Sequence, residues 1–339
     1  MHLKRKIPLF ISIISTLFYF SSVKAEIKVV TSIKPIHSLV SYIMEGVGSP
    51  DLIVDGYNSP HGFSLKPSHA KMLQEADIVI YVGEGVEEFL EKPLESIASN
   101  AVKFELLGQS GIKKLKFRER NIFGDHDDHD DHGHDKKAKK EDHDDHDDHD
   151  HDKKAKKDDH DDHGHDDHGH GHGEFDPHIW LDPMNAKIIV KKVTNQLSKL
   201  DKENSSIYKS NSKKALKELD QMIKEVKSSV NKDAKVVVFH DAYQYFEKRF
   251  KVNIIGALTV NTDVLPGAEQ LAEIREVIEH EKVTCVLSEP QFNPDIVETI
   301  AKDTNISSGV LDPLGATLDS GKTLYFDLIK NISLSIKNC

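Results

Sequence analysis

Three histidines have the residue type and the placement to bind a metal ion. His61 follows a turn rich in glycine and proline, His178 lies in the string DPHIWLDP, and His240 ends the apolar run VVVF. Each lies where a predicted strand, or a turn after one, opens into a loop, and ligands bind at the carboxyl ends of strands in open α/β sheets. The three imidazoles could converge into a nitrogen site, and Zn²⁺ accepts tetrahedral nitrogen ligation at about 2.0–2.1 Å.

Spacing alone is weak evidence for such a site, because a single histidine at a strand end is more often a hydrogen-bonded structural residue. The other histidines of this part of the chain have plainer interpretations. We expect His69 at an exposed helix position, His280 at the surface, and His37 at the start of a helix, where it could line a cleft. The metal interpretation is favoured because the three candidates lie in unusual strings and because the chain also carries a histidine-rich repeat.

That repeat occupies residues 125–173 and holds 14 of the 21 histidines. The unit DHDDHDDHGHDKKAKKE recurs almost unchanged and then degrades into Asp-His-Gly pieces. With two alanines as its only apolar residues it cannot bury enough surface to offset its ordering entropy, so we expect disorder without metal. The histidine and aspartate side chains of the repeat predict several weak sites for Zn²⁺, Ni²⁺ or Cu²⁺ that act as a reservoir or sensor. The alternative is that the repeat is an acidic linker that only makes the protein more soluble.

Charge and the N-terminus limit the class of protein. The net charge is −12, and the repeat alone carries that amount, so no basic face for nucleic acid is left.

Residues 1–25 combine Lys4, Arg5 and Lys6 with an apolar run at 7–20 and the cleavage-like string VKA. This pattern predicts a signal peptide and a periplasmic protein. A membrane anchor is the alternative, but the run is short for a spanning helix.

Strand and helix patterns alternate on both sides of the repeat, which predicts an α/β protein with two lobes, each a mostly parallel sheet covered by helices. The predicted strands are 28–33, 52–54, 78–82 and 102–107 in the first lobe, and 236–239, 252–258, 283–288 and 309–311 in the second. The predicted helices are 37–45, 67–75 and 86–98 in the first lobe, and 268–282, 294–303 and 323–337 in the second.

A long helical stretch separates the two lobes. Residues 183–200 form one predicted helix, and from 204 to 230 apolar residues recur at steps of three and four. A helix of that length would extend about 40 Å and suits a rigid strut. We therefore predict an N-terminal lobe at 26–203 that contains the repeat, a linking helix at 204–230, and a C-terminal lobe at 231–339.

The chain has two cysteines, Cys285 and Cys339. In an exported protein they could pair and close a long loop. Two free thiols are one alternative, and metal ligation is another, although neither cysteine has a second Cys or His at ligand spacing.

Several strings, in a fixed order along the chain, resemble a known family. They are PHGFSLKPSHAKMLQEADIVIYVG at 60–83, DPHIWLDPMNA at 176–186, VFHDAYQYF at 238–246, and SEPQFNP with LDPLG at 288–294 and 311–315. Together they resemble the cluster A-I solute-binding proteins of metal ABC importers, most closely the periplasmic zinc-binding members of the ZnuA type. The resemblance extends over residues 27–339, with the repeat where such proteins carry a histidine-rich loop.

The resemblance implies that His61, His178 and His240 bind Zn²⁺, with Asp312 or a water molecule as fourth ligand. Some zinc relatives have an acidic residue where this chain has Pro60, and that departure favours Asp312 or water. Manganese relatives carry a glutamate in the place of His240, which favours zinc here. The resemblance also implies a disulfide between the two cysteines. The implied function is capture of zinc between the lobes and delivery to the membrane permease of an ABC importer, by a monomer.

Residues beside the candidate ligands have open roles. Asp241 and Glu289 could each orient an imidazole through its second nitrogen, although packing or capping is as plausible for Asp241, and Trp180 is expected to pack beside the site. We predict no enzyme, because HExxH, GxSxG and P-loop patterns are absent from the sequence. The alternatives are a periplasmic zinc hydrolase, with Asp312 or Glu289 as general base, and a zinc storage or chaperone protein.

Overall fold

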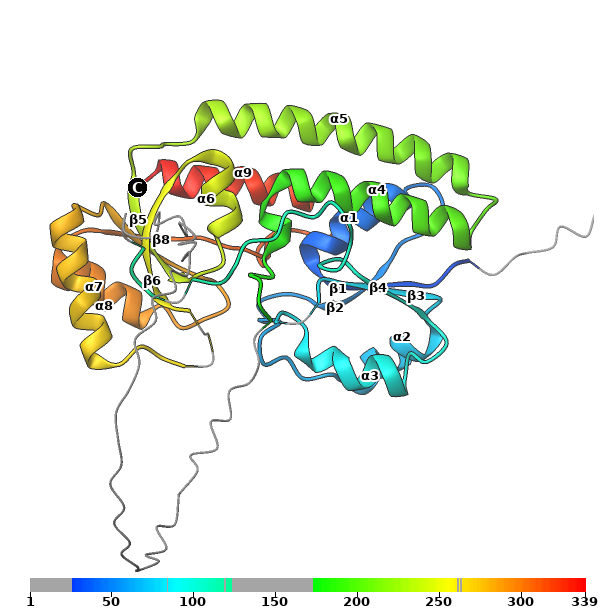
Figure 1. Cartoon of the computed structure of the whole chain (residues 1–339), viewed down its shortest axis with the longest axis horizontal. Helices are drawn as coiled ribbons and strands as arrows, with labels where there is room; N and C mark the ends of the chain where they lie inside the picture. Colours follow the sequence, from blue (N-terminus) through cyan, green and yellow to red (C-terminus); the bar gives the residue numbers. More distant parts are fainter. Residues whose placement is uncertain (1–25, 84, 119, 124–172, 261, 263) are drawn as a thin grey trace, which may run out of the picture.

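The computed structural model describes residues 26–83, 85–118, 120–123, 173–260, 262 and 264–339 (Figure 1). The predicted signal peptide and the repeat up to residue 172 lie outside the described residues, and so do the predictions made for them. Along the part that is described, no helix has both the length and the apolar character needed to cross a membrane.

The N-terminal sheet has four parallel strands in the order β2-β1-β3-β4. Its strands are β1 (Val29–Ile33), β2 (Asp51–Val54), β3 (Ile78–Tyr81) and β4 (Val102–Glu105), and its helices are α1 (Lys34–Met44), α2 (Pro67–Glu75), η1 (Glu88–Leu90) and α3 (Glu91–Ser96). All five residues of β1 are buried, as befits a central strand between two helical layers. Helix α1 begins at Lys34, three residues before the predicted start at 37. Pro35 does not prevent this, because the N–H groups of the first helical turn have no partner within the helix.

The C-terminal sheet is also four-stranded and parallel, in the order β6-β5-β7-β8. Its strands are β5 (Lys235–His240), β6 (Asn253–Thr259), β7 (Cys285–Ser288) and β8 (Ser307–Val310), and its helices are α6 (Gln244–Phe250), α7 (Ala268–Glu281) and α8 (Asp295–Thr304). Two parallel sheets covered by helices confirm the predicted fold class. Helix α6 was not predicted, since its seven residues are too few for a clear helical period.

A layer of helices spans both sheets. It consists of α4 (Pro183–Leu200), α5 (Ser205–Ser229) and α9 (Leu324–Lys337), together with α1. Figure 1 shows α5 running along the top of the molecule over both sheets. Helix α5 packs against α4, α1 and α9 through the apolar stripe that the sequence predicted, which includes Leu219, Met222 and Val226. One hydrophobic core therefore extends from β1 through this layer to β5, and a second, smaller one lies under α7 and α8.

Cys285 and Cys339 form a disulfide, which confirms the predicted pairing. Cys285 is the first residue of β7 and is 2% exposed, while Cys339 follows α9 at the C-terminus. The bond therefore ties the end of the shared helical layer to the C-terminal sheet.

Replacing both cysteines with alanine is expected to lower the free energy of unfolding by up to about 4 kcal/mol, because the open chain gains entropy when unfolded. Urea unfolding of the oxidised protein and of the Cys285→Ala/Cys339→Ala variant measures the difference. The unmodified protein with a reductant is the control and should behave like the variant. Equal unfolding midpoints for the oxidised protein and the variant would contradict this.

Candidate metal site

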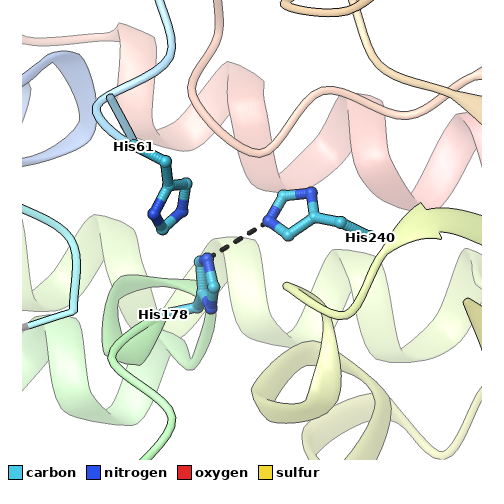
Figure 2. A group of neighbouring side chains, drawn as sticks. All are labelled: His61, His178 and His240. Atoms are coloured by element: carbon cyan, nitrogen blue, oxygen red, sulfur yellow. Dashed lines mark hydrogen bonds between the residues drawn. The ribbon is translucent and has the colours of Figure 1, made fainter. Parts of the chain in front are cut away.

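His61, His178 and His240 come together between the two sheets. Each offers one ring nitrogen, and the three nitrogens lie within 4.8 Å of one another. Figure 2 shows the three rings, from three separate segments, facing a common point. Among the residues that the structure describes, this is the only group of three or more His, Cys, Asp or Glu side chains close enough to hold one metal ion.

The strand ends of both sheets supply this meeting point. His61 lies in the loop that follows β2 and is half-buried, whereas His240 is the last residue of β5 and is 5% exposed. His178 is 4% exposed and directly precedes a short turn of 3₁₀-helix, η2 (Ile179–Leu181), that leads into α4. His61 and His240 thus follow the carboxyl ends of parallel strands, as the sequence suggested, whereas His178 does not follow a strand.

Two carboxylates accept hydrogen bonds from the Nδ1 atoms of two of the rings. Nδ1 of His178 donates to Asp176 Oδ1 at 2.8 Å, and Nδ1 of His240 donates to Glu289 Oε1 at 2.6 Å. The Tyr243 hydroxyl shares its one proton between the Leu311 carbonyl, at 2.9 Å, and Glu289 Oε1, at 3.2 Å. A carboxylate on Nδ1 fixes the ring orientation and leaves Nε2 to act as the ligand atom. The two Nε2 atoms do face each other, 3.3 Å apart.

Burial and neighbouring charge set the protonation of the pair. Burial, together with the nearby His240, lowers the pKa of His178 well below its ordinary value. Burial alone would lower the pKa of His240 too, but the charge and hydrogen bond of Glu289 raise it above the ordinary value. His240 is therefore the more basic of the two rings, and it is the donor when a proton lies between the two Nε2 atoms. A metal ion bound to both rings would take the place of that proton.

Asp312, predicted as a possible fourth ligand, lies outside the group of three histidines. Its Oδ1 accepts hydrogen bonds from the backbone of Leu314 and Gly315 and from Nε2 of Gln291, and its Oδ2 accepts from the backbone of Ala316. The carboxylate thus organises the loop after β8 and ties it to Gln291, which follows β7.

Three residues near the rings turn out as follows. Glu289 orients an imidazole, as the sequence suggested. Asp241 does not, since its carboxylate instead accepts a hydrogen bond from Arg118 at 3.0 Å. Trp180 packs beside the site: its ring centroid lies 5.3 Å from that of His178, and its Nε1 donates to the carbonyl of Pro313.

The other three histidines that the structure describes lie outside the group. His69 was predicted to be exposed, and that was wrong: it is 8% exposed, because its Nδ1 accepts from Lys66 N at the start of α2 and its ring stacks on Phe63. The Nε2 atom of His37 donates to the carbonyl of Pro50. The side chain of His280 is 83% exposed, as predicted.

Sequence reasoning missed the roles of Asp176, Tyr243 and Arg118. A signal for Asp176 was present, because a carboxylate two residues before a candidate ligand can reach its Nδ1. No local signal marks Arg118, whose partner Asp241 is 123 residues away along the chain.

Two cavities adjoin the rings. A cavity of about 510 Å³ is lined by the three histidines and by residues that include Lys116, Glu174 and Thr262. A second cavity, of about 10 Å³, is lined by the same histidines and by Glu289 and Gln291. The smaller one has room for about one water molecule.

Comparison with known proteins decides the family. Residues 29–339 match the family model described as zinc-uptake complex component A, periplasmic. The chain belongs to this family. The family is one of periplasmic transport components rather than enzymes, so the hydrolase alternative has no support.

Curated relatives agree over nearly the whole chain. The high-affinity zinc uptake system protein ZnuA of Brucella abortus is 43% identical over 313 residues, which are 92% of this chain and 91% of the relative. The ZnuA proteins of Haemophilus influenzae and Yersinia pestis are 36% and 32% identical, over 97% and 93% of this chain and 97% and 92% of their own lengths.

Solved structures share the fold. A crystal structure of ZnuA gives a TM-score of 0.70 at 22% identity and covers 93% of this chain and 99% of its own. A laminin-binding protein of Streptococcus agalactiae, described as an adhesin with metal-transporting activity, gives 0.66 at 20% identity, with 91% and 99% covered.

Glu289→Gln is expected to weaken metal binding about 10- to 100-fold, because a neutral amide holds the His240 imidazole less firmly than a carboxylate does. Competition with a chelator measures the affinity, followed by the fluorescence of Trp180, the only tryptophan, which adjoins His178. Glu279→Gln, at an exposed position of α7, is the matched control. An affinity equal to that of the control would contradict the role of Glu289.

Proposed function

We propose that the chain captures one Zn²⁺ ion between its two lobes in the periplasm and delivers it to the membrane permease of an ABC importer. The observation that carries this proposal is the convergence of three histidine nitrogens within 4.8 Å at the ends of segments from both sheets. Membership of the zinc-uptake family supports zinc as the cargo. A signal peptide at 1–25, removed on export, and a monomeric protein belong to the same proposal.

His61, His178 and His240 are the proposed protein ligands. Three neutral imidazoles suit Zn²⁺, which readily takes tetrahedral nitrogen ligation, better than Mn²⁺, which favours oxygen. A water molecule is the proposed fourth ligand, because the Asp312 oxygens already accept three hydrogen bonds from the loop after β8 and one from Gln291. Asp312 could bind the ion only if that loop released it.

Release needs only a small movement. The histidines come from segments on both sides of the interface, so a slight tilt of one lobe, 26–203, against the other, 231–339, would lengthen the bonds of about 2 Å that Zn²⁺ requires. The shared helical layer and the proposed linking helix at 204–230 argue against a wide hinge. Docking on the permease would drive the tilt. Protons compete for the same nitrogens, so affinity falls as pH is lowered.

The repeat at 125–173 is proposed to hold further zinc ions weakly, as a reservoir or sensor. Its last residue, Gly173, and the adjacent Glu174 line the large cavity that opens onto the three histidines. Ions carried by the chain that leads to this point would enter the protein close to the tight site. Each ion must order a stretch of that chain, which lowers its affinity.

Alanine at any one of the three histidines is expected to weaken the tight site by at least about 100-fold, since a metal site that loses one of three protein ligands loses most of its binding energy. Chelator competition followed by Trp180 fluorescence measures this without interference from ions in the repeat. His280→Ala, at an exposed position, is the matched control. Unchanged affinity in all three variants would remove the proposed site.

Growth separates the importer from a storage protein. A strain without this gene should grow poorly when zinc is chelated, and added zinc or the intact gene should restore growth. The His178→Ala gene should not restore it. Normal growth of the deletion strain under zinc limitation would count against uptake.

Deletion of residues 125–173 is expected to leave one tight zinc site and to remove the weaker ones, because the three histidines lie outside the repeat. Isothermal titration of both proteins with zinc counts the ions of each class. A tight site that disappears with the repeat would refute this division of roles.

A further inference from the structure

A strap of chain connects the two sheets beside the proposed zinc site. The strap is residues 113–118 and 120–123, which follow the N-terminal sheet in sequence and end against β6, the edge strand of the C-terminal sheet. Figure 1 shows it as the teal trace that crosses between them. Phe123 N donates to the carbonyl of Ile255, and Ala257 N donates to that of Asn121, both at 2.8 Å. The strap therefore extends the C-terminal sheet by a short antiparallel pairing.

The strap packs closely against β6 because residue 256 is a glycine. Ile122 pairs with Gly256 of β6 in an antiparallel bridge. A Cβ atom on Gly256 would lie 2.7 Å from the carbonyl oxygen of Asn121. Because this neighbour is backbone, any side chain at position 256 must push the strap away from the sheet.

The middle of the strap holds the segment that carries His178. Lys116 pairs with Phe175 in an antiparallel bridge, and Asp176 N donates to the carbonyl of Leu115 at 2.8 Å. The hydroxyl of Tyr245, on α6, donates to the carbonyl of Asp176 at 2.7 Å and accepts from Leu115 N at 3.0 Å. Asp176 in turn orients the His178 ring, so the strap fixes one proposed ligand through its neighbour.

Arg118 connects the same strap to the segment of His240. Its side chain is 18% exposed, and its guanidinium donates to Asp241 Oδ1 at 3.0 Å and to Glu247 on α6. The guanidinium also lies over the ring of Phe123, 3.9 Å from its centroid. Asp241 directly follows His240 and is 8% exposed. Arg118 is thus the cation between two carboxylates that are both largely shielded from water.

We propose that the strap is a brace between the lobes, and that Arg118 is a positioning residue that keeps His178 and His240 at zinc-binding distance. Without the guanidinium, Asp241 and Glu247 would repel each other and draw in water, and the end of β5 would shift. The ligand on that strand would shift with it, so bound zinc would leave faster. This inference rests on the proposed zinc site.

The direction of the effect distinguishes positioning from plain electrostatics. Arg118 and Lys116 both line the cavity that opens onto the histidines. Removing a positive charge there would, by charge alone, attract Zn²⁺ more strongly and slow its release. Positioning predicts the opposite sign, because a displaced ligand weakens the site.

The test measures zinc release from the full chain loaded with one equivalent of zinc and mixed with excess chelator, followed by Trp180 fluorescence. Arg118→Met is expected to release zinc at least about tenfold faster, as changes beside a ligand commonly do. Arg120→Met removes the same charge from an exposed position of the same strap and should match the unmodified protein. Unchanged or slower release from folded Arg118→Met overturns the proposal.

A second variant tests the strap without changing any charge. Gly256→Ala should also speed release, and in the double variant with Arg118→Met the two effects should not add, because both loosen one brace. It also carries the test if Arg118→Met does not fold. Tight zinc binding by the His178→Ala variant would refute the zinc site itself. If His178→Ala loses zinc binding but folded Gly256→Ala releases zinc at the normal rate, only the brace is refuted.

Discussion

The structure depends on one constraint: three imidazole nitrogens from distant segments must meet within a few ångströms. No single helix or strand can bring them together. The meeting is possible because both sheets are parallel and send the loops that follow β2 and β5 toward one interface. The helical layer formed by α1, α4, α5 and α9 fixes one sheet relative to the other, and the histidines occupy the remaining gap.

Buried carboxylates make that gap suitable for a cation. Burial raises the pKa of Asp176 to about 7 and that of Asp241 to about 6, the latter against the opposing charge of Arg118. Such groups are costly unless a hydrogen bond or a positive charge offsets them. The His178 imidazole does so for Asp176 and the Arg118 guanidinium for Asp241, and a divalent ion on the inner nitrogens would add to them. Asp176 therefore orients a candidate ligand directly, whereas Asp241 links the end of β5 to Arg118.

Binding and release place opposite demands on this arrangement. A shared hydrophobic core and a strap between the sheets keep the ligands close together, which favours capture from dilute solution. Delivery requires that they separate when the protein docks on its permease. A site assembled from both sides of an interface satisfies both demands, since a small tilt changes every metal–ligand distance while the packed core stays intact. The proposed weak sites of the repeat lie outside this mechanism and would affect only how ions arrive.

The sequence by itself determined the fold class and nearly every strand and helix, because apolar periodicity is a local property. It marked His61, His178 and His240 as candidate ligands through the unusual strings around them and the family that those strings resemble. It did not predict α6, whose seven residues carry too short a pattern, or the burial of His69, which depends on a cap and on Phe63. Only the tertiary structure decided that Asp312 organises a loop and that Arg118 joins the strap to Asp241. Those roles arise from contacts between segments far apart in the chain, and one sequence carries no record of which segments touch.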